Sequence, residues 1–353
     1  MKDALFFPSG RLALLHAMCR FGLGSGDAVI VPAYYCASGL QAIVAHGFES
    51  VFIDVTDGLE ISDQNLEAAF SNRKVKAVLL VHFFGFAPAS RDEAVRRCHA
   101  AGVRVIEDHC HSFLPYLDSG RRSPAADACI FSMRKTLPVA DGGALFPGDA
   151  GEGIVAAQPG SLSFARDIPF LVMRLIESAM IRLGWPNPYG SAIGRLRQAF
   201  ARPEECGGES GSGTGVVLPS WSLGHFLSDE PYLRRVAQRR RANYRKLAEA
   251  LAPLEVQMVF PILDESAVPQ VLPVLDSSGT LAGFLRGRGI GAYRWPGEDL
   301  PVEVGAAMEV FPNAVKLNDS MACLPVHQDI DDVHIASMVA AVSDWQRTRG
   351  MRP

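Results

Sequence analysis

The sequence predicts an α/β protein built on a parallel sheet, and two observations carry this prediction. Short apolar segments alternate with segments of helical periodicity, in the manner of strand–helix–strand units. Polar and aromatic side chains follow several of the apolar segments, as they do where a ligand site lies beyond the carboxyl ends of parallel strands. The residues at or near these ends are Tyr34, Tyr35, His82, Asp108 and Ser132.

The first half of the chain contains the elements of such a sheet. A helix is expected over residues 9–21, with Ser9 as its cap and glycines at its end. Apolar strands and further helices then alternate along the chain. Strands are expected at 28–32, 51–54, 77–82, 103–107 and 128–132, and helices at 63–70 and 90–101.

The second half indicates a separate, smaller domain. Residues 207–215, GGESGSGTG, form a Gly/Ser stretch typical of a surface loop or hinge. A long helix is expected at about 229–252, followed by short apolar segments, a helix near 279–288 and a closing helix from about 330. We therefore predict a large domain at 1–206, a flexible loop or linker at 207–228 and a small C-terminal α/β domain at 229–353.

Composition and charge exclude several classes of function. The chain is 48% hydrophobic and 20% charged, with a formal net charge of -4, which argues against a nucleic acid partner. The apolar segment at 168–185 contains Arg174, Glu177 and Arg182, so no stable membrane insertion is expected. Seven cysteines without paired spacing indicate reduced thiols, and no signal peptide is recognised, so a cytoplasmic location is expected.

Two polar residues in the stretch from Val103 to Leu145 indicate the chemistry. Asp108 ends the segment VRVIED, and Lys135 follows ACIFS in SMRKTLPVADGGAL. A pyridoxal phosphate site needs an acid at a strand end and a lysine between a strand and glycines. The carboxylate keeps the pyridine nitrogen protonated, and the lysine holds the aldehyde as a Schiff base and moves protons. Taken singly, a capping aspartate and a solvated lysine are the commoner interpretations.

This stretch resembles the DegT/DnrJ/EryC1/StrS family of sugar aminotransferases. Glu107-Asp108 matches the acidic pair of the family's Glu-Asp-x-x-Gln pattern, and Lys135 precedes Gly142-Gly143 by the family's interval. Ser132 lies three residues before Lys135, against the family's usual five, which marks a divergent branch. The resemblance covers residues 5–150 and, less closely, 229–350.

The resemblance implies the fold and the partners. It implies a pyridoxal phosphate-dependent transferase of fold type I, whose large domain holds a mostly parallel sheet of the seven-stranded type. A small C-terminal α/β domain completes the chain. It also implies a homodimer with active sites at the interface, an amino donor and a keto acceptor as small-molecule partners, and pyridoxal 5'-phosphate bound to Lys135.

Roles for single residues also come from the resemblance. Asp108 is expected to face the pyridinium nitrogen. His111 stands where the family has a glutamine near the cofactor's phenolic oxygen. Ser9, Gly10 and Arg11 stand at a helix start that binds phosphate in the family, where free amides attract an anion.

Three further residues are expected to border the cofactor, and four to meet substrate. Gap-free alignment sets Cys36 at the family's aromatic position, so the neighbouring Tyr35 is predicted to stack on the ring instead. A place in the core is the plainer interpretation. The other candidates are His82 and Ser132 for the cofactor, and Arg134, Tyr293, Arg294 and His327 for substrate.

No metal is predicted, because zinc needs three or four ligands and His109-Cys110-His111 has no matching second cluster.

Three functional hypotheses follow. In the first, Lys135 serves an aminotransferase that moves an amino group from glutamate or glutamine to a nucleotide-linked keto-sugar. In the second, the same cofactor supports another reaction type or a non-sugar ketone, as the atypical Arg11 and His111 suggest. In the third, the chain is a non-catalytic regulatory homologue that keeps the fold.

Overall fold

The structure is a computed structural model that describes most of the chain. The described residues are 4–115, 126–139, 141–148, 220–297 and 299–350, with single positions 168, 171, 172, 175, 176 and 179. Among them no helix is long and apolar enough to cross a lipid bilayer.

A seven-stranded sheet forms the larger part of the molecule, in the order β1-β7-β6-β5-β4-β2-β3. Neighbours from β3 to β6 pair in parallel, while β7 pairs antiparallel with β6 and with β1. This confirms the predicted mostly parallel sheet. The strands are β1 (Leu5–Phe7), β2 (Ala28–Pro32), β3 (Glu49–Ile53), β4 (Val75–Val81), β5 (Arg104–Asp108), β6 (Ala128–Ser132) and β7 (Gly143–Pro147).

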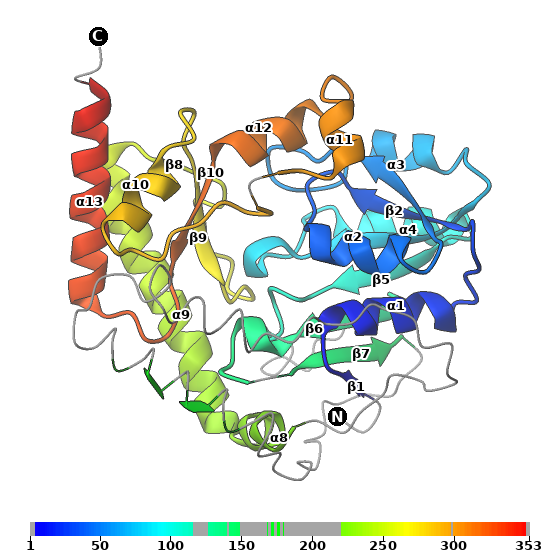
Figure 1. Cartoon of the computed structure of the whole chain (residues 1–353), viewed down its shortest axis with the longest axis horizontal. Coiled ribbons are helices and arrows are strands. Elements are labelled where there is room, and N and C mark those ends of the chain that lie inside the picture. Colours follow the sequence, from blue (N-terminus) through cyan, green and yellow to red (C-terminus); the bar gives the residue numbers. More distant parts are fainter. Residues whose placement is uncertain are drawn as a thin grey trace.

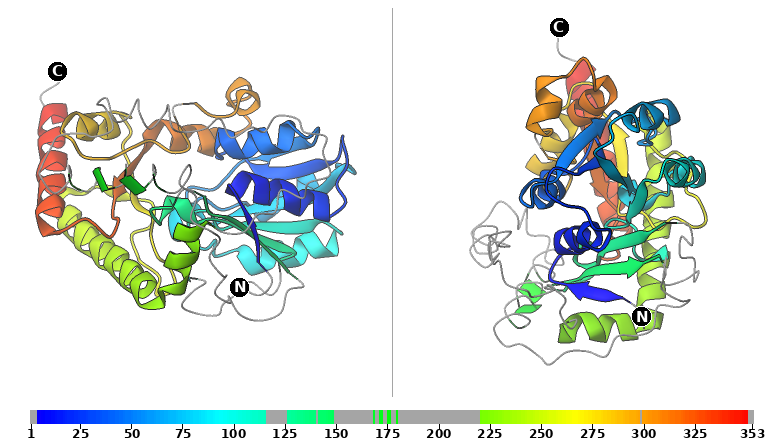
Figure 2. Two further views of the ribbon diagram at one scale, coloured as in Figure 1. Left: turned by 60° about the horizontal axis from the view of Figure 1, so that its bottom comes forward. Right: turned by 90° about the vertical axis from the view of Figure 1, so that its right-hand side faces the viewer.

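Helices cover both faces of this sheet (Figures 1 and 2). Strand residues alternate between the two apolar clusters, so that Ile106 packs on one side and Val105 on the other. Helices α1 (Gly10–Arg20) and α2 (Ala37–Val44) lie on the Ile106 face. The Val105 face packs against α3 (Asp63–Ala69), α4 (Arg91–Ala100) and α8 (Trp221–Ser228).

The C-terminal part contains a small antiparallel sheet in the order β10-β9-β8. The long helix α9 joins it to the large sheet, because its first turns pack with the Val105 face and its last turns with β9. The elements are α9 (Glu230–Leu251), β8 (Gln257–Met258), β9 (Val271–Leu275), α10 (Leu281–Gly287), α11 (Val302–Ala306), α12 (Pro312–Ser320), β10 (Met321–Pro325) and α13 (Asp332–Gly350), with a short 3-10 turn η3 (Ala252–Leu254) after α9.

The predicted loop at 207–228 is partly helical. Helix α8 occupies residues 221–228, where Ser220 caps it by accepting the Leu223 amide. Residues 207–219 lie outside the described residues. The division into domains at 206 and 228 stays a prediction.

A tight turn after β4 joins the two parts beside the ends of the parallel strands. In η1 (Phe83–Gly85), Gly85 has a φ of +99°, and a Cβ there would lie 2.3 Å from the Val268 carbonyl oxygen. The Gln270 amide donates to the Phe84 carbonyl at 2.7 Å, and the Tyr34 hydroxyl donates to the Trp295 carbonyl. The C-terminal part is therefore anchored at the edge where the predicted site lies.

Candidate active site

Asp108 ends β5 with its carboxylate held by two donors. Its Oδ1 accepts the Cys110 amide at 2.8 Å, and its Oδ2 accepts the Tyr35 hydroxyl at 2.8 Å. The first bond is the local turn that aspartate favours two residues before an amide. Because β5 alternates, Asp108 shares the sheet face of Ile106 with α1 and α2. The carboxylate therefore has a fixed orientation in a site where Asp108 is only 6% exposed.

Lys135 lies in the short turn η2 (Met133–Lys135), directly after β6. Its side chain is exposed, and the described residues contain no hydrogen-bond or ion-pair partner for its ammonium. Its charge acts on Cys110 and on His111, which places the ammonium near both. Lys135 therefore lies near the loop that follows Asp108, as expected for a site at the ends of β5 and β6.

The glycine pair explains how the lysine turn reaches this position. Gly142 has a φ of +140°, and its carbonyl accepts the Met133 amide at 2.8 Å. A Cβ at Gly143 would lie 2.1 Å from the Ser9 carbonyl oxygen. Only glycine permits this approach, so the turn that carries Lys135 packs against the start of α1.

The start of α1 offers a group of anion donors. The first amides of a helix have no acceptor within it, and they carry partial positive charge. Gly10 lies against the ends of β5 and β6, since a Cβ there would be 2.9 Å from Cys110 Sγ and 3.3 Å from Ser132 Cβ. Ser9 and Ser132 are largely buried residues, and neither hydroxyl forms a hydrogen bond with a described residue. Arg11 follows, half-buried, in the first turn.

His111 is a neutral donor by its surroundings. Its Nδ1 accepts the Phe84 amide at 3.2 Å, which assigns the ring proton to Nε2. Burial, and next the charge of Lys135, lowers the pKa of His111 well below its ordinary value. The ring stacks on Phe84 and meets the edge of Trp295. An N–H donor is thus available where the family has a glutamine amide.

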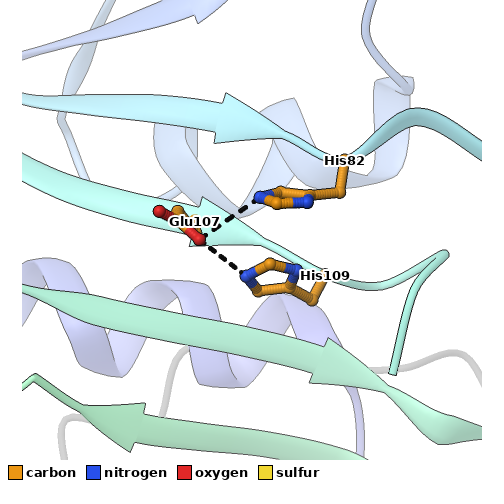
Figure 3. Close-up of side chains that lie close together, drawn as sticks. All are labelled: His82, Glu107 and His109. Atoms are coloured by element: carbon orange, nitrogen blue, oxygen red, sulfur yellow. Dashed lines mark hydrogen bonds and ion pairs between the residues drawn. The ribbon is translucent and has the colours of Figure 1, made fainter. Parts of the chain in front are cut away.

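His82 lies on the other face of β5, in a buried cluster with Glu107 and His109 (Figure 3). Glu107 Oε2 accepts from His109 Nε2 at 2.8 Å and from His82 Nε2 at 3.2 Å, and Oε1 accepts from Arg91 Nε at 2.6 Å. The His82 side chain therefore faces Glu107, away from the carboxylate of Asp108.

This cluster has the ligand types of a metal site, with three possible ligand atoms within 4.8 Å of one another. Its charges favour a hydrogen-bonded network instead. Burial alone raises the pKa of Glu107, but hydrogen bonds from His109 and His82 outweigh it and hold that pKa well below its usual range. The carboxylate is already matched by the guanidinium of Arg91. A divalent cation would leave uncompensated positive charge in a buried place, which is costly.

The network predicts an acid-sensitive stability. Burial, with the neighbouring His82, lowers the pKa of His109 from 6.5 to about 4. Between these values an unfolded chain takes up a proton that the folded chain does not. Stability therefore falls as the pH drops, and His109 accounts for about 3 kcal/mol of the loss.

Urea unfolding of the cofactor-free protein between pH 7 and 4 measures this loss. The matched variant is His109→Gln, which keeps an N–H donor for Glu107 but does not titrate. Its unfolding free energy should fall less steeply over this interval. Equal slopes for the two proteins would contradict the assignment.

The four predicted substrate residues are spread over two places. Arg134 is exposed beside Lys135 in η2. Tyr293 forms a β-bridge with Cys323, and Arg294 donates to the Asn318 carbonyl. His327 is half-buried, and its Nδ1 lies 3.7 Å from Asp329 Oδ2. The charge of Lys135 acts on Cys110 and on His111. Sequence reasoning missed Trp295, which brings the C-terminal part against His111.

The residues that converge fit pyridoxal phosphate. Two unpartnered hydroxyls and a helix start match a phosphate, a fixed carboxylate matches a pyridinium nitrogen, and an exposed amine matches an aldehyde. The Nε2–H of His111 matches a phenolic oxygen. The set lies on one face of the sheet, beyond the carboxyl ends of β5 and β6.

Solved structures share this fold at low sequence identity. An aminotransferase of the DegT DnrJ EryC1 StrS type from Brucella abortus is 19% identical, with a TM-score of 0.65, over 97% of this chain and 85% of the other. Helicobacter pylori PseC, an aminotransferase of pseudoaminic acid biosynthesis, is 17% identical, with a TM-score of 0.69, over 97% and 86%. Bacillus subtilis NtdA with bound cofactor PMP is 16% identical, with a TM-score of 0.68, over 97% and 72%.

The sequence itself matches a family model over residues 1–152, which hold the sheet and all the residues that converge on Lys135. The match confirms the predicted family, and with it an enzyme of the transferase class with pyridoxal phosphate as cofactor. Over residues 1–152 this chain matches the model of the DegT/DnrJ/EryC1/StrS aminotransferase family.

Proposed function

We propose that this protein transfers an amino group from an amino acid, glutamate or glutamine, to a nucleotide-linked keto-sugar. One observation carries the proposal at the site. The Lys135 amine, the Asp108 carboxylate and the anion donors at the start of α1 meet on one face of the sheet, although they come from three separate segments. This combination serves amine transfer on pyridoxal phosphate.

The residues then have distinct tasks. Bound pyridoxal phosphate supplies an aldehyde that accepts the amino group and a ring that takes up the electron pair left when a proton departs. The Lys135 amine, next to His111, would hold the cofactor through its Nζ and move a proton at that atom. Asp108 keeps the ring nitrogen protonated. Ser9, Gly10, Arg11 and Ser132 hold the phosphate.

The buried side of the site keeps the cofactor oriented. His111 donates from Nε2 toward the phenolic oxygen, and it stays neutral because burial opposes its protonation. Trp295 and Phe84 pack around its ring, so the donor cannot turn away. Arg134, exposed beside Lys135, is the candidate for meeting an anionic group of the substrate. The His82 amide donates to the Asp108 carbonyl at 3.0 Å, while its side chain faces Glu107. His82, Tyr293, Arg294 and His327 stay candidates.

A structural neighbour supports the acceptor, and the family resemblance supports the assembly. A structural neighbour from Helicobacter pylori acts in pseudoaminic acid biosynthesis, which favours a sugar acceptor. We propose a homodimer with sites at its interface, on the resemblance to the family. The six cysteines of the described residues form no disulfide, compatible with a cytoplasmic enzyme.

Loading the protein with pyridoxal phosphate and adding amino donors one at a time tests the proposal. Glutamate or glutamine should convert the bound cofactor to its amine form, seen as loss of visible absorbance, and nucleotide-linked keto-sugars should restore it. If only non-sugar ketones restored the absorbance, the acceptor would be a non-sugar ketone and not a keto-sugar. A protein that binds the cofactor but responds to no donor would favour another reaction type or a regulatory role.

A further inference from the structure

The hydroxyl of Tyr35 is placed on the carboxylate by more than one feature of the chain. Its donor bond to Asp108 Oδ2 is 2.8 Å long, and Tyr35 is 3% exposed. Gly39, in the first turn of α2, makes room for the ring. A Cβ at Gly39 would lie 2.4 Å from the ring's Cε1 and 2.6 Å from its hydroxyl oxygen. The tyrosine can reach Asp108 only because residue 39 has no side chain.

The protonation state of Tyr35 supports a donor role. Burial, and next the negative charge of Asp108, raises the pKa of Tyr35 well above its ordinary value. The hydroxyl therefore stays protonated across the pH range of enzyme activity. A protonated phenol beside a carboxylate donates a charge-assisted hydrogen bond, which is stronger than a neutral one.

A carboxylate offers about four lone-pair sites, two on each oxygen. In Asp108 the Cys110 amide takes one site on Oδ1 and the Tyr35 hydroxyl takes one on Oδ2. The two bonds prevent rotation of the carboxylate plane. The Cys110 side chain also interacts with this carboxylate, and the lone pairs that remain are the ones that a ring nitrogen can meet.

We propose that Tyr35 is a positioning residue that acts through Asp108 on the ring nitrogen of pyridoxal phosphate. This inference rests on the proposed function and refines the predicted role of Tyr35. Its hydroxyl orients the carboxylate, and this action does not depend on stacking of its ring. The phenylalanine variant separates the two roles, because it keeps the ring and removes only the hydroxyl.

The decisive measurement compares two ligands, pyridoxal phosphate and its analogue with a carbon in place of the ring nitrogen. Tyr35→Phe should weaken binding of pyridoxal phosphate by about tenfold, the effect of one hydrogen bond to a charged group. Binding of the analogue should not change, since it has no ring nitrogen for Asp108 to meet. Gly39→Ala, which displaces the tyrosine ring, should give the same pattern.

Tyr34→Phe is the matched control. Tyr34 is also buried, but its hydroxyl donates to the Trp295 carbonyl and not to Asp108. Its loss should leave the ratio of the two affinities unchanged. Thermal unfolding of each variant checks that it is folded.

The outcomes separate the inference from the proposed function. Failure of the unaltered protein to bind pyridoxal phosphate would reject the proposed function. Normal binding by the unaltered protein, with equal losses for both ligands in Tyr35→Phe, would assign Tyr35 to packing and overturn the inference. Unchanged affinity for both ligands in that variant would overturn it as well.

Discussion

Replacing Lys135 with alanine is expected to lower the rate of amine transfer by about 10⁴-fold, the upper range for a positioned proton-transfer group. Lys135 carries an amine beside His111 and the Asp108 loop, and alanine removes that amine. Borohydride treatment of the loaded protein should link the cofactor covalently to residue 135 of the unaltered chain and not of the variant. Peptide mass mapping measures the link, and single-turnover kinetics measure the rate.

Two further results make the lysine test specific. The control is Lys76→Ala, which removes another exposed lysine. Lys76 lies near the amino end of β4, whereas the site lies beyond the carboxyl ends of the strands, so this change should not affect the rate. Small primary amines added to Lys135→Ala should restore part of the activity, because they supply the missing base. A variant at residue 135 that keeps full activity would refute the assignment.

Replacing Asp108 with asparagine is expected to lower the rate by about 10²- to 10³-fold, the usual loss when one preorganised polar group is removed from an active site. A neutral amide cannot hold a proton on the ring nitrogen by charge. The amide has one acceptor oxygen, whereas the carboxylate accepts hydrogen bonds on both, from the Tyr35 hydroxyl and the Cys110 amide. Stopped-flow absorbance with the amino donor measures the rate of the half-reaction.

Asp54→Asn is the matched control for this change. Asp54 is another buried aspartate, beyond the end of the edge strand β3, where it accepts the amides of Asn313 and Ala314. Its replacement should lower thermal stability and leave the half-reaction of the folded enzyme unchanged. A half-reaction rate in Asp108→Asn equal to that of the unaltered protein would exclude the proposed ring-nitrogen contact.

Local sequence signals predicted most of the sheet and its helices. The helix expected at 9–21 is α1, at residues 10–20, and the one expected at 229–252 is α9, at 230–251. These succeed because capping residues and apolar periodicity are local properties. The antiparallel strand at Leu5–Phe7 was not foreseen, since it has only three residues and depends on a partner far along the chain.

The side-chain environment of the site depends on contacts that sequence spacing does not reveal. Tyr35 meets Asp108 across 73 positions, and His82 meets Glu107 across 25. Which face of β5 each side chain takes follows from strand order, and that order is a property of the whole sheet. The sequence therefore indicates that His82 lies at a strand end, while its direction toward Glu107 needs the structure.

The pairing of β1 with β7 bears on how the protein acquires its site during synthesis. Leu5 lies opposite Leu145 and Phe7 opposite Gly143, so the start of α1 is held in place by a segment made almost 140 residues later. Contacts of such separation form slowly, because a long loop must close first. A nascent chain that ends before β7 has both Ser9 and Lys135, but it lacks the strand that packs against the start of α1 and pairs with β1. We therefore expect the cofactor to bind only after β7 has been synthesised, and chains truncated before β7 should not retain the cofactor.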